Sequence, residues 1–581
     1  FTSIIDTGGT GDYSSLSLWE TAVDSDLTAA ANKVFGGTKT GTIADGASVT
    51  GSVSLATGTV YHATSTQIYL IVLTGTFQSA EQIQVDGSNY FTTTDAGDSA
   101  IAVAKCRATT GAADTTAVTV DGWTTSATNY IKIWTDPNEN YRHSGKWDEG
   151  KYQLNVPEGI GNAGLSIVES YTRVDGLQVK RSITQYSADS CINSSASSGE
   201  IQISNNICQI VNNSTYSSYG IRKNTTSSTA TYKIWNNIVY GAKDTDNGSG
   251  GGFYLESNAA VSENVYVYDN TVYGCYYGFY KSGSTIILKN NIAYNNTTDY
   301  SGTFNSASTN NLSKDATAPA YNTYYTNASV IFADEYNKDF HLDSSDTAAR
   351  NMGTILYDAG DDANLNFTTD VDNNARLDSA GTWDIGADES IAKIYRSVGP
   401  SASSALASGG AANYGNLEVK ATYLSGSTTN IVDYVASFWR PLPDTVGVGD
   451  AIQYDKDNGG TIDSIAFITK RIDSSHFSVR SVSGAAPNLT TVPDDTFGVY
   501  RSYQSLFKAE SGDENDSLND TIEAFESWSN GKDIATGQEQ WNIAAYANST
   551  TADTVATTID GWTTSADSFI KIYTPTRSDE V

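Results

Sequence analysis

The chain has 581 residues, of which 66 are acidic and 34 basic, giving a formal net charge of −32. Such a surface repels nucleic acids and anionic membranes, and no stretch reaches the length of a membrane-spanning helix, so we expect neither nucleic-acid binding nor membrane insertion. The length exceeds that of one ordinary core and predicts several domains or an elongated repeat architecture.

The composition favours short strands joined by polar turns. The 36 tyrosines outnumber the 17 phenylalanines, and Gly, Ser, Thr, Asn and Asp are abundant. The four cysteines show no CxxC spacing, which argues against a zinc site. The chain begins with Phe rather than Met, which indicates a processed product or a fragment. We therefore predict an all-β protein.

The first 33 residues contain "GDYSSLSLWETA" (11–22), which we interpret as the start of a solenoid. Residues 34–103 include "TGTVYHATSTQIYLIVLTGTFQSAEQIQVDGSNYF" (57–91), with its own alternating strands and turns. We expect this second segment to be a small inserted β module.

The clearest local order lies between about 199 and 296. Four segments share one pattern, in which an alternating apolar strand leads into Asn or Asp, then Asn, then a β-branched residue; they are "IQISNNIC" (201–208), "YKIWNNIV" (232–239), "VYVYDNTV" (265–272) and "IILKNNIA" (286–293). Asn and Asp tolerate the left-handed backbone of a sharp bend, so each unit reads as strand, corner, strand. The pattern predicts a right-handed parallel β-helix, with residues 104–390 as its body and terminal cap.

Stacked coils would bring equivalent side chains together. Ile203, Ile234, Val267 and Leu288 would form one aliphatic column. The second Asn of each corner would form a structural ladder, because an amide carries both donors and acceptors; these residues are Asn206, Asn237, Asn270 and Asn291.

Two features recur at the scale of the whole chain. "DGWTTSATNYIKIW" (121–134) returns as "DGWTTSADSFIKIY" (560–573), with ten of fourteen positions identical. "GVYRSYQSLFKAES" (498–511) looks like a diverged copy of the opening at 11–22. We therefore expect residues 391–499 to form a β spacer domain and residues 500–581 to begin a second, incomplete β-helix repeat, so that the chain holds one period and part of the next.

The opening segment, "VDGWTTSATNYIKIWTDPNENYRHSGKWDEGKY" (120–152), the rungs and the ending "WDIGADES" (383–390) resemble bacterial and metagenomic right-handed parallel β-helix repeat surface proteins of the pectate-lyase-like superfamily. The resemblance spans most of residues 1–390 and implies the fold and a secreted, cell-surface location. It says little about activity, because this fold hosts many functions. Relatives that cleave acidic polysaccharides use Ca²⁺-binding carboxylates with an Arg or Lys base.

One segment resembles a metal site. In "DKDNGGTID" (455–463), Asp455, Asp457 and Asp463 match positions 1, 3 and 9 of a calcium loop, although Gly459 and Ala466 stand where further ligands belong. A hairpin turn explains the same residues for backbone reasons, so Ca²⁺ is one of two readings. "DVDNNARLD" (370–378) is a similar acidic turn.

The outward positions of the four rungs carry no acidic cluster, and we name no catalytic residue. Trp235 and Tyr268 share one outward register and could stack on a sugar ring or a neighbouring subunit, or simply cover the sheet. We expect a non-enzymatic extracellular surface protein, a stiff tandem rod or filament subunit that associates head to tail or with neighbouring repeats and has an adhesive role. The alternative is a β-helix protein that cleaves or binds polysaccharides, which a groove lined by acidic or Arg/Lys side chains along the rungs would favour.

Overall fold

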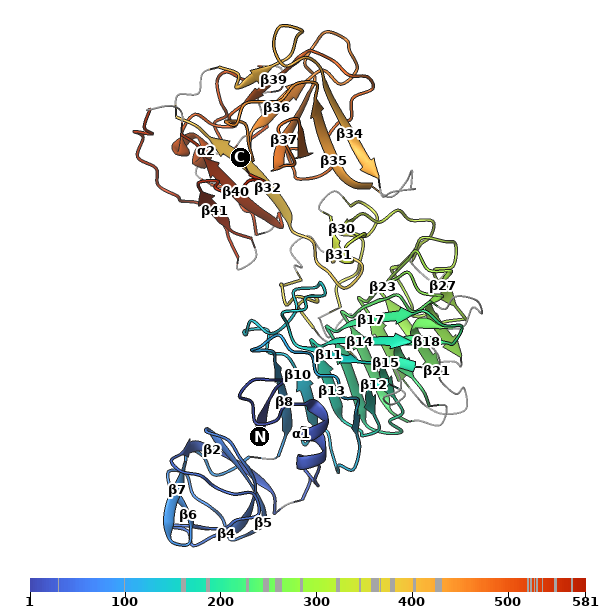
Figure 1. The fold of residues 1–581 in the computed structure, drawn as a ribbon, viewed down its shortest axis with the longest axis vertical. Helices are drawn as coiled ribbons and strands as arrows, with labels where there is room; N and C mark the ends of the chain where they lie inside the picture. Colours follow the sequence, from blue (N-terminus) through green and yellow to red (C-terminus); the bar gives the residue numbers. More distant parts are fainter. Residues whose placement is uncertain are drawn as a thin grey trace. The chain divides into compact units, whose positions relative to one another are not determined.

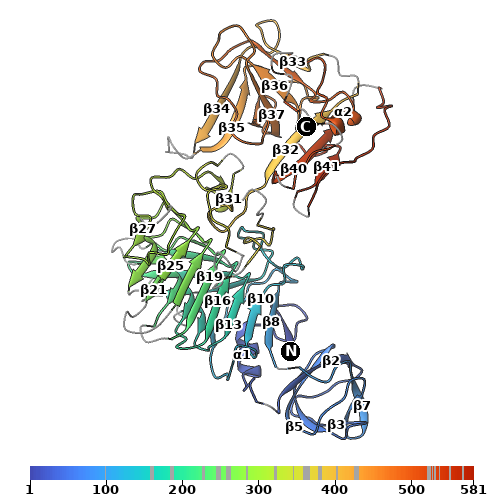
Figure 2. The same cartoon turned by 180° about the vertical axis from the view of Figure 1, so that it is seen from behind.

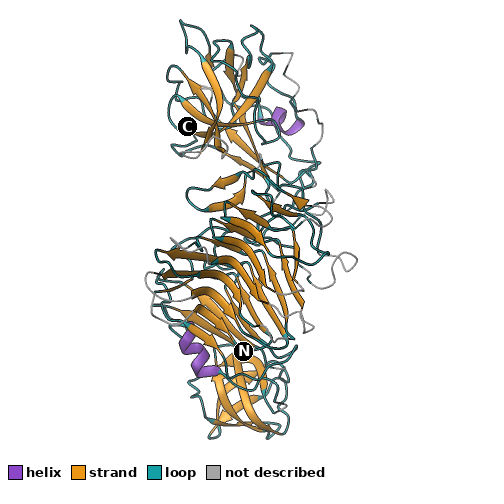
Figure 3. Ribbon diagram, turned by 90° about the vertical axis from the view of Figure 1, so that its right-hand side faces the viewer, coloured by secondary structure: helices purple, strands orange, loops and turns teal. Residues whose placement is uncertain are grey.

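The structure is a computed structural model of the chain. It describes residues 1–29, 31–98, 100–157, 163–183, 189–225, 229–243, 250–256, 264–282, 286–319, 324–343, 346–356, 365, 367–376, 382–400, 404–423, 431–519, 522, 525–526, 528, 531–535, 537–547, 551–565 and 568–580. Strands make up 43% and helices 3% of it, which confirms the all-β class (Figure 3). None of the helices among these residues is long and apolar enough to cross a membrane.

Two compact units divide the chain. The first contains Phe1–Ala328, Gly353–Asn374 and Ile385–Asp388, and the second contains Ser329–Met352, Ala375–Asp384 and Glu389–Val581.

Three long parallel sheets form the main body of the first unit (Figures 1 and 2). The first sheet has the order β1 (Thr2–Asp6), β8 (Ala102–Arg107), β10 (Ile131–Trp134), β13 (Thr172–Asp175), β16 (Glu200–Ser204), β19 (Thr231–Trp235), β22 (Asn264–Tyr268) and β25 (Ile286–Lys289). The second has the order β11 (Gln153–Val156), β14 (Gln178–Ile183), β17 (Ile207–Asn212), β20 (Ile238–Tyr240), β23 (Thr271–Tyr273), β26 (Ile292–Tyr294), β28 (Asn311–Ser313) and β29 (Tyr324–Tyr325). The third has the order β9 (Val118–Val120), β12 (Ala163–Ile167), β15 (Asp189–Ser194), β18 (Ser218–Lys223), β21 (Gly251–Glu256), β24 (Tyr277–Ser282) and β27 (Thr298–Ser301).

From β10 to β27, successive strands along the chain belong to the first, second and third sheets in turn. β13, β14 and β15 lie in the first, second and third sheets, and β16, β17 and β18 follow in the same order. Each strand pairs in parallel with its equivalent one circuit later, as β13 does with β16 and β14 does with β17. This architecture fits the predicted solenoid, in which every circuit is hydrogen-bonded to its neighbours.

The corner between the first and second sheets is built by asparagine and aspartate. The residue at the bend has a left-handed backbone in five successive circuits, with φ between 52° and 55° at Asn205, Asn236, Asp269, Asn290 and Asn310. Asn and Asp adopt this conformation at lower cost than other non-glycine side chains, which explains why these five circuits share the same corner.

The interior of the circuits is aliphatic. Val174, Ile203, Ile234, Val267 and Leu288 stand in register on adjacent strands of the first sheet, and all are at most 1% exposed. The strand alternation visible in the sequence therefore places one side of each strand in a continuous core.

A short helix, α1 (Leu16–Val23), covers the start of the first unit. Ser15 caps it by accepting a hydrogen bond from the backbone N–H of Leu18. Trp19 is completely buried and packs on Trp123 of the DGWTT segment, with 5.6 Å between the ring centroids. The first copy of this segment thus packs against α1 at the start of the parallel sheets.

The insertion after α1 forms a closed barrel of six strands. They are β2 (Lys33–Lys39), β5 (Gln67–Thr74), β4 (Thr57–Ala63), β3 (Ser48–Gly51), β6 (Gln82–Val85) and β7 (Ser88–Thr93). Phe35, Ile68 and Phe91 lie in its separate buried core.

The second unit contains a seven-stranded antiparallel sheet, a two-stranded ribbon and a three-stranded parallel sheet. The large sheet has the order β33 (Ala407–Ser408), β39 (Phe497–Tyr500), β36 (Ala451–Tyr454), β37 (Ser464–Arg471), β38 (His476–Arg480), β35 (Ile431–Phe438) and β34 (Leu417–Tyr423). The ribbon pairs β30 (Phe332–Asp334) with β31 (Asp339–Leu342), and the parallel sheet has the order β32 (Ala392–Val398), β40 (Glu539–Ala545) and β41 (Ile570–Tyr573).

The three-stranded sheet repeats the entrance of the first unit. The backbone N–H of Leu16 donates to Asp114 Oδ2 at 2.7 Å, and 490 positions later the N–H of Leu506, in α2 (Leu506–Ser511), donates to Asp553 Oδ2 at 2.8 Å. Ser505 caps α2 as Ser15 caps α1. The second DGWTT copy therefore belongs to the same kind of module as the first.

The predicted boundary at residue 500 divides this second module. Its first strand, β32, precedes the seven-stranded sheet and pairs in parallel with β40 over Ala392–Val398. The spacer is thus inserted between the first strand and the helix of the repeat instead of preceding the repeat. Sequence reasoning missed this because the two paired strands are separated by the whole inserted sheet.

Candidate functional site

A groove of about 360 Å³ lies over the first sheet of the first unit. It spans strands β10, β13, β16 and β19, which Figure 2 shows side by side. Its lining residues are Tyr130, Lys132, Pro137, Arg142, Arg173, Asp175, Gln202, Ser204, Asn205, Trp235, Phe367, Thr368, Thr369 and Asn373.

Two outward columns of the sheet supply its floor. Lys132, Arg173 and Gln202 stand in register on β10, β13 and β16. Two residues further along the strands, Asp175 is in register with Ser204, which is in register with Trp235. Because side chains alternate across a strand, these positions face away from the aliphatic core.

Arg142 reaches the groove from the loop between β10 and β11. Its Nη1 and Nη2 atoms approach the two carboxylate oxygens of Asp175 at 3.4 and 3.3 Å, and Nη1 also donates to the carbonyl of Thr135 at 3.2 Å. Asp175 accepts two further hydrogen bonds, from Ser204 and Asn205. Gly176 makes room for the guanidinium, since a Cβ there would lie 2.7 Å from Arg142 Cζ.

His143 anchors the same loop. Its Nδ1 accepts a hydrogen bond from the backbone N–H of Gly145, and its Nε2 lies 2.9 Å from the carbonyl oxygen of Asn205. The Nε2 atom therefore carries the proton and donates. Burial lowers the pKa of His143 to about 3, so the ring is neutral and structural.

The opposite wall is aromatic. The Trp235 ring stacks on Phe367 with 5.9 Å between centroids and 29° between planes. Asn236 Nδ2 donates to the carbonyl of Thr369 at 2.6 Å and fastens the segment carrying Phe367 to the β19 corner. Trp235 stays partly exposed and lines the groove.

The charge of the groove is opposite to that of the chain. Among its described lining residues, three are cations and Asp175 is the one carboxylate. Desolvation lowers the pKa of Lys132, and the neighbouring Arg142 and Arg173 act in the same direction while Asp175 opposes them. A polar floor with an aromatic wall can hold a planar or ring-shaped polar ligand.

Tyr268 does not join this surface. It lies in the predicted outward column, one strand beyond Trp235, but its side chain is completely buried. Its ring packs edge-on against Tyr266 at 6.0 Å, and Lys289 Nζ lies 5.4 Å from its centroid. The alternation of side chains along the strand predicts on which face of the sheet Tyr268 lies. It does not predict whether other parts of the chain cover that position.

The predicted ladder residues lie at the second position of each corner and are structural. Asn206, Asn237, Asn270 and Asn291 are all completely buried, and each donates its side-chain N–H to the amide oxygen of the next one at 2.9–3.0 Å. Asn311 extends the ladder by one circuit, accepting from Asn291 at 2.9 Å.

Asp455, Asp457 and Asp463 bring carboxylate oxygens within 4.8 Å of one another in the second unit. The turn already uses several of these oxygens. Asp455 accepts from the backbone N–H groups of Asp457, Gly460 and Thr461, and Lys456 Nζ lies 2.8 Å from Asp463 Oδ2. Calcium at this turn stays a prediction, and an incoming ion would compete with Lys456.

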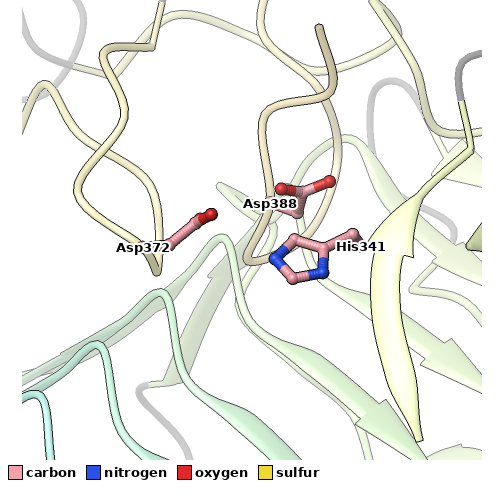
Figure 4. Close-up of side chains that lie close together, drawn as sticks. All are labelled: His341, Asp372 and Asp388. Carbon is pink, nitrogen blue, oxygen red and sulfur yellow. The ribbon is translucent and has the colours of Figure 1, made fainter. Parts of the chain in front are cut away.

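In the first unit, Asp372 and Asp388 also have carboxylate oxygens within 4.8 Å of each other (Figure 4). Asp372 belongs to the acidic turn predicted from 370–378, whose last two residues lie outside the described part of the chain. His341, labelled in the same figure, belongs to the second unit, where its Nδ1 contacts Asp339 Oδ1 on β31.

Sequence reasoning missed most of the groove. Lys132 lies in the quoted DGWTT segment and Arg142 in the RHSGKW segment that follows it, yet neither was singled out. Phe367 comes from a segment more than 130 residues beyond Trp235, with no periodicity to connect them. The sequence signal that could have indicated the groove was an excess of basic residues at outward positions on one face of the rungs, in a chain with a net negative charge.

Scans of this chain against protein-family models, curated proteins and solved structures found no match.

Proposed function

We propose that the first unit is a right-handed parallel β-helix that binds a glycan in the groove over its first sheet. The handedness follows from the parallel connections, since crossovers between parallel strands of one sheet are right-handed in nearly all proteins. The observation that carries the function is the combination of the partly exposed Trp235 with Lys132 and Arg173 in one 360 Å³ groove.

Several features support a saccharide. An aromatic ring offers an apolar face to the C–H groups of a sugar, and the polar side chains Gln202, Thr369 and Asn373 line the same groove within reach of hydroxyl groups. The first sheet continues on both sides of the groove as a run of eight parallel strands, which suits a linear polymer.

The groove fits binding better than hydrolysis. Glycoside hydrolysis by the usual route needs two carboxyl groups beside the scissile bond. Among the described lining residues, Asp175 is the one carboxylate, and Arg142, Ser204 and Asn205 already occupy it. We therefore propose a glycan-binding surface protein, secreted and displayed outside the cell.

A structural role as a rod is the second candidate. It is supported by the side-chain ladder that joins successive circuits from Asn206 to Asn311 in addition to the backbone pairing. Rods or head-to-tail filaments in negative-stain electron microscopy would support this role, and uniform monomers would count against self-association. The two roles are compatible, because a stiff rod can present a binding groove.

Glycan-array binding of the full chain tests the proposal. The Trp235→Ala variant should lose binding, while Tyr254→Ala, an aromatic on the third sheet that stacks on Tyr280 at 4.5 Å, should retain it. Circular dichroism checks that both variants are folded. Absence of binding to any glycan, or equal binding by Trp235→Ala, would overturn the proposal.

A further inference from the structure

Resting on the proposed glycan groove, we propose that its ligand is an acidic saccharide whose carboxylate or sulfate group lies over Lys132 and Arg173. The two residues are directly paired in the register of β10 and β13, so their side chains leave the sheet as neighbours and face the same groove. Two adjacent cations repel each other until an anion is placed beside them.

Elsewhere on this face, several basic residues have carboxylate partners. Lys105 Nζ lies 2.7 Å from both Asp136 and Glu139, and Lys233 Nζ lies 2.8 Å from Glu200. At the groove itself, Arg142 is paired with Asp175. The chain thus neutralises cations on the flanks of the groove and, at Arg142, inside it.

Lys132 and Arg173 are different. In the part of the chain that the structure describes, no ion pair within 4 Å joins either of them to a carboxylate, although the protein has about twice as many acidic as basic residues. Each is held instead over an aromatic ring, Lys132 Nζ at 3.5 Å from the Trp134 centroid and the Arg173 guanidinium at 3.5 Å from that of Tyr130. This support fixes the positions of the two cations and leaves their hydrogen-bond donors for a ligand.

The chemistry of the pair selects the anion. An arginine fork binds a planar carboxylate or a sulfate through two parallel hydrogen bonds, and a lysine adds a point charge. Burial disfavours the charged form of Lys132, so an anion bound beside Lys132 would stabilise that charged form. The aromatic wall at Trp235, two strands beyond Arg173, then receives another ring of the same saccharide.

The site therefore discriminates between saccharides by charge. The chain's net charge of −32 opposes any polyanion at long range, which would slow association at low salt. Inside the groove, the short-range electrostatic interaction of an anion with Lys132 and Arg173 is attractive. Specificity for acidic saccharides thus arises from the local pair and not from the overall field.

The test is isothermal titration of the full chain with two matched pairs of ligands. One pair is an oligogalacturonate hexasaccharide and its fully methyl-esterified form, and the other is sulfated and unsulfated dextran oligosaccharide. We expect one acidic member to bind about tenfold or more tightly than its neutral partner, because charge-assisted hydrogen bonds exceed neutral ones. The identity of that member distinguishes a carboxylate from a sulfate ligand.

The double variant Lys132→Gln/Arg173→Gln should remove the preference for the acidic member. Arg222→Gln is the matched control, since Arg222 also lies over tyrosine rings, Tyr219 at 4.9 Å and Tyr254 at 5.6 Å, but on the third sheet. Equal affinity for both members, or an unchanged preference in the double variant, would overturn this inference. Equal binding that still depends on Trp235 would leave the glycan groove standing, whereas no binding of any ligand would count against both proposals.

Discussion

Asn237 donates its side-chain N–H to Oδ1 of Asn270, one circuit further along the chain, at 2.9 Å. The same oxygen accepts the backbone N–H of Asn237, and Asn237 Nδ2 also lies 2.9 Å from the carbonyl of Ile203. One completely buried amide thus joins three successive circuits at the corner between the first and second sheets.

Replacing Asn237 by Ala should destabilise the first unit by roughly 2–4 kcal/mol, because it leaves buried donors and acceptors on both neighbouring circuits without partners. The urea midpoint of the full chain, followed by tyrosine and tryptophan fluorescence, measures the effect. Asn138→Ala, at an exposed position in the loop after β10, serves as control. A loss in Asn237→Ala no larger than in the control would contradict the structural role of the ladder.

The pH dependence of stability should report on Asp299, which is 1% exposed on β27. Burial raises its pKa to about 6, and the nearby Asp315 acts in the same direction. The folded state therefore holds this proton to higher pH than the unfolded state does. The free energy of unfolding should fall by up to roughly 3 kcal/mol as the pH rises from about 4 to 6.

The Asp299→Asn variant isolates that contribution, because an amide does not titrate in this range. Its urea midpoint should vary less with pH than that of the wild-type chain between about 4 and 6. Other buried acids still contribute, such as Glu526, whose pKa is raised to about 7 by burial. Identical slopes in variant and wild type would refute the assignment to Asp299.

The acidic turn at Asp455 should stabilise the second unit without a metal ion. Although desolvation acts to raise it, backbone N–H groups of the turn hold the pKa of Asp455 below its usual value. Asp455→Ala should lower the melting temperature equally in EDTA and in millimolar Ca²⁺, since it removes acceptors for those N–H groups. A rise in melting temperature with Ca²⁺ that this variant abolishes would establish calcium binding instead.

Leu55, at the tip of the β3–β4 hairpin in the barrel, is 73% exposed and has a φ of 57°. A left-handed backbone costs a leucine about 1 kcal/mol, which glycine avoids. Leu55→Gly should therefore raise the stability of the barrel by roughly 0.5–1 kcal/mol in calorimetry. Val53→Gly, in the same hairpin and 66% exposed, has no left-handed backbone to relieve and should give no gain.

Local sequence patterns predicted the local parts of the fold. The corner that Asn236 and Asn237 make recurs in the neighbouring circuits, and each copy carries the full signal for a bend and a buried amide. The alternation of apolar residues around Ile234 likewise predicted which face of the strand points inward, because it is also a local pattern. These features depend on residues a few positions apart.

Long-range features escaped prediction. The pairing of β32 with β40 joins segments separated by an inserted sheet, so the second module was expected to begin about a hundred residues too late. Whether an outward residue is exposed depends on distant segments, which is why Trp235 lines a groove and Tyr268 is buried. The groove itself combines Arg142, Arg173 and Phe367 from three parts of the chain. No local sequence pattern predicts that these residues lie close together.

A crystal structure of the full chain with a bound acidic oligosaccharide tests the central claim most directly. We predict one sugar ring on Trp235 and a carboxylate or sulfate of the same saccharide within hydrogen-bonding distance, about 3 Å, of Lys132 and Arg173. A saccharide bound on any other surface, with the groove over the first sheet left to solvent, would contradict the account.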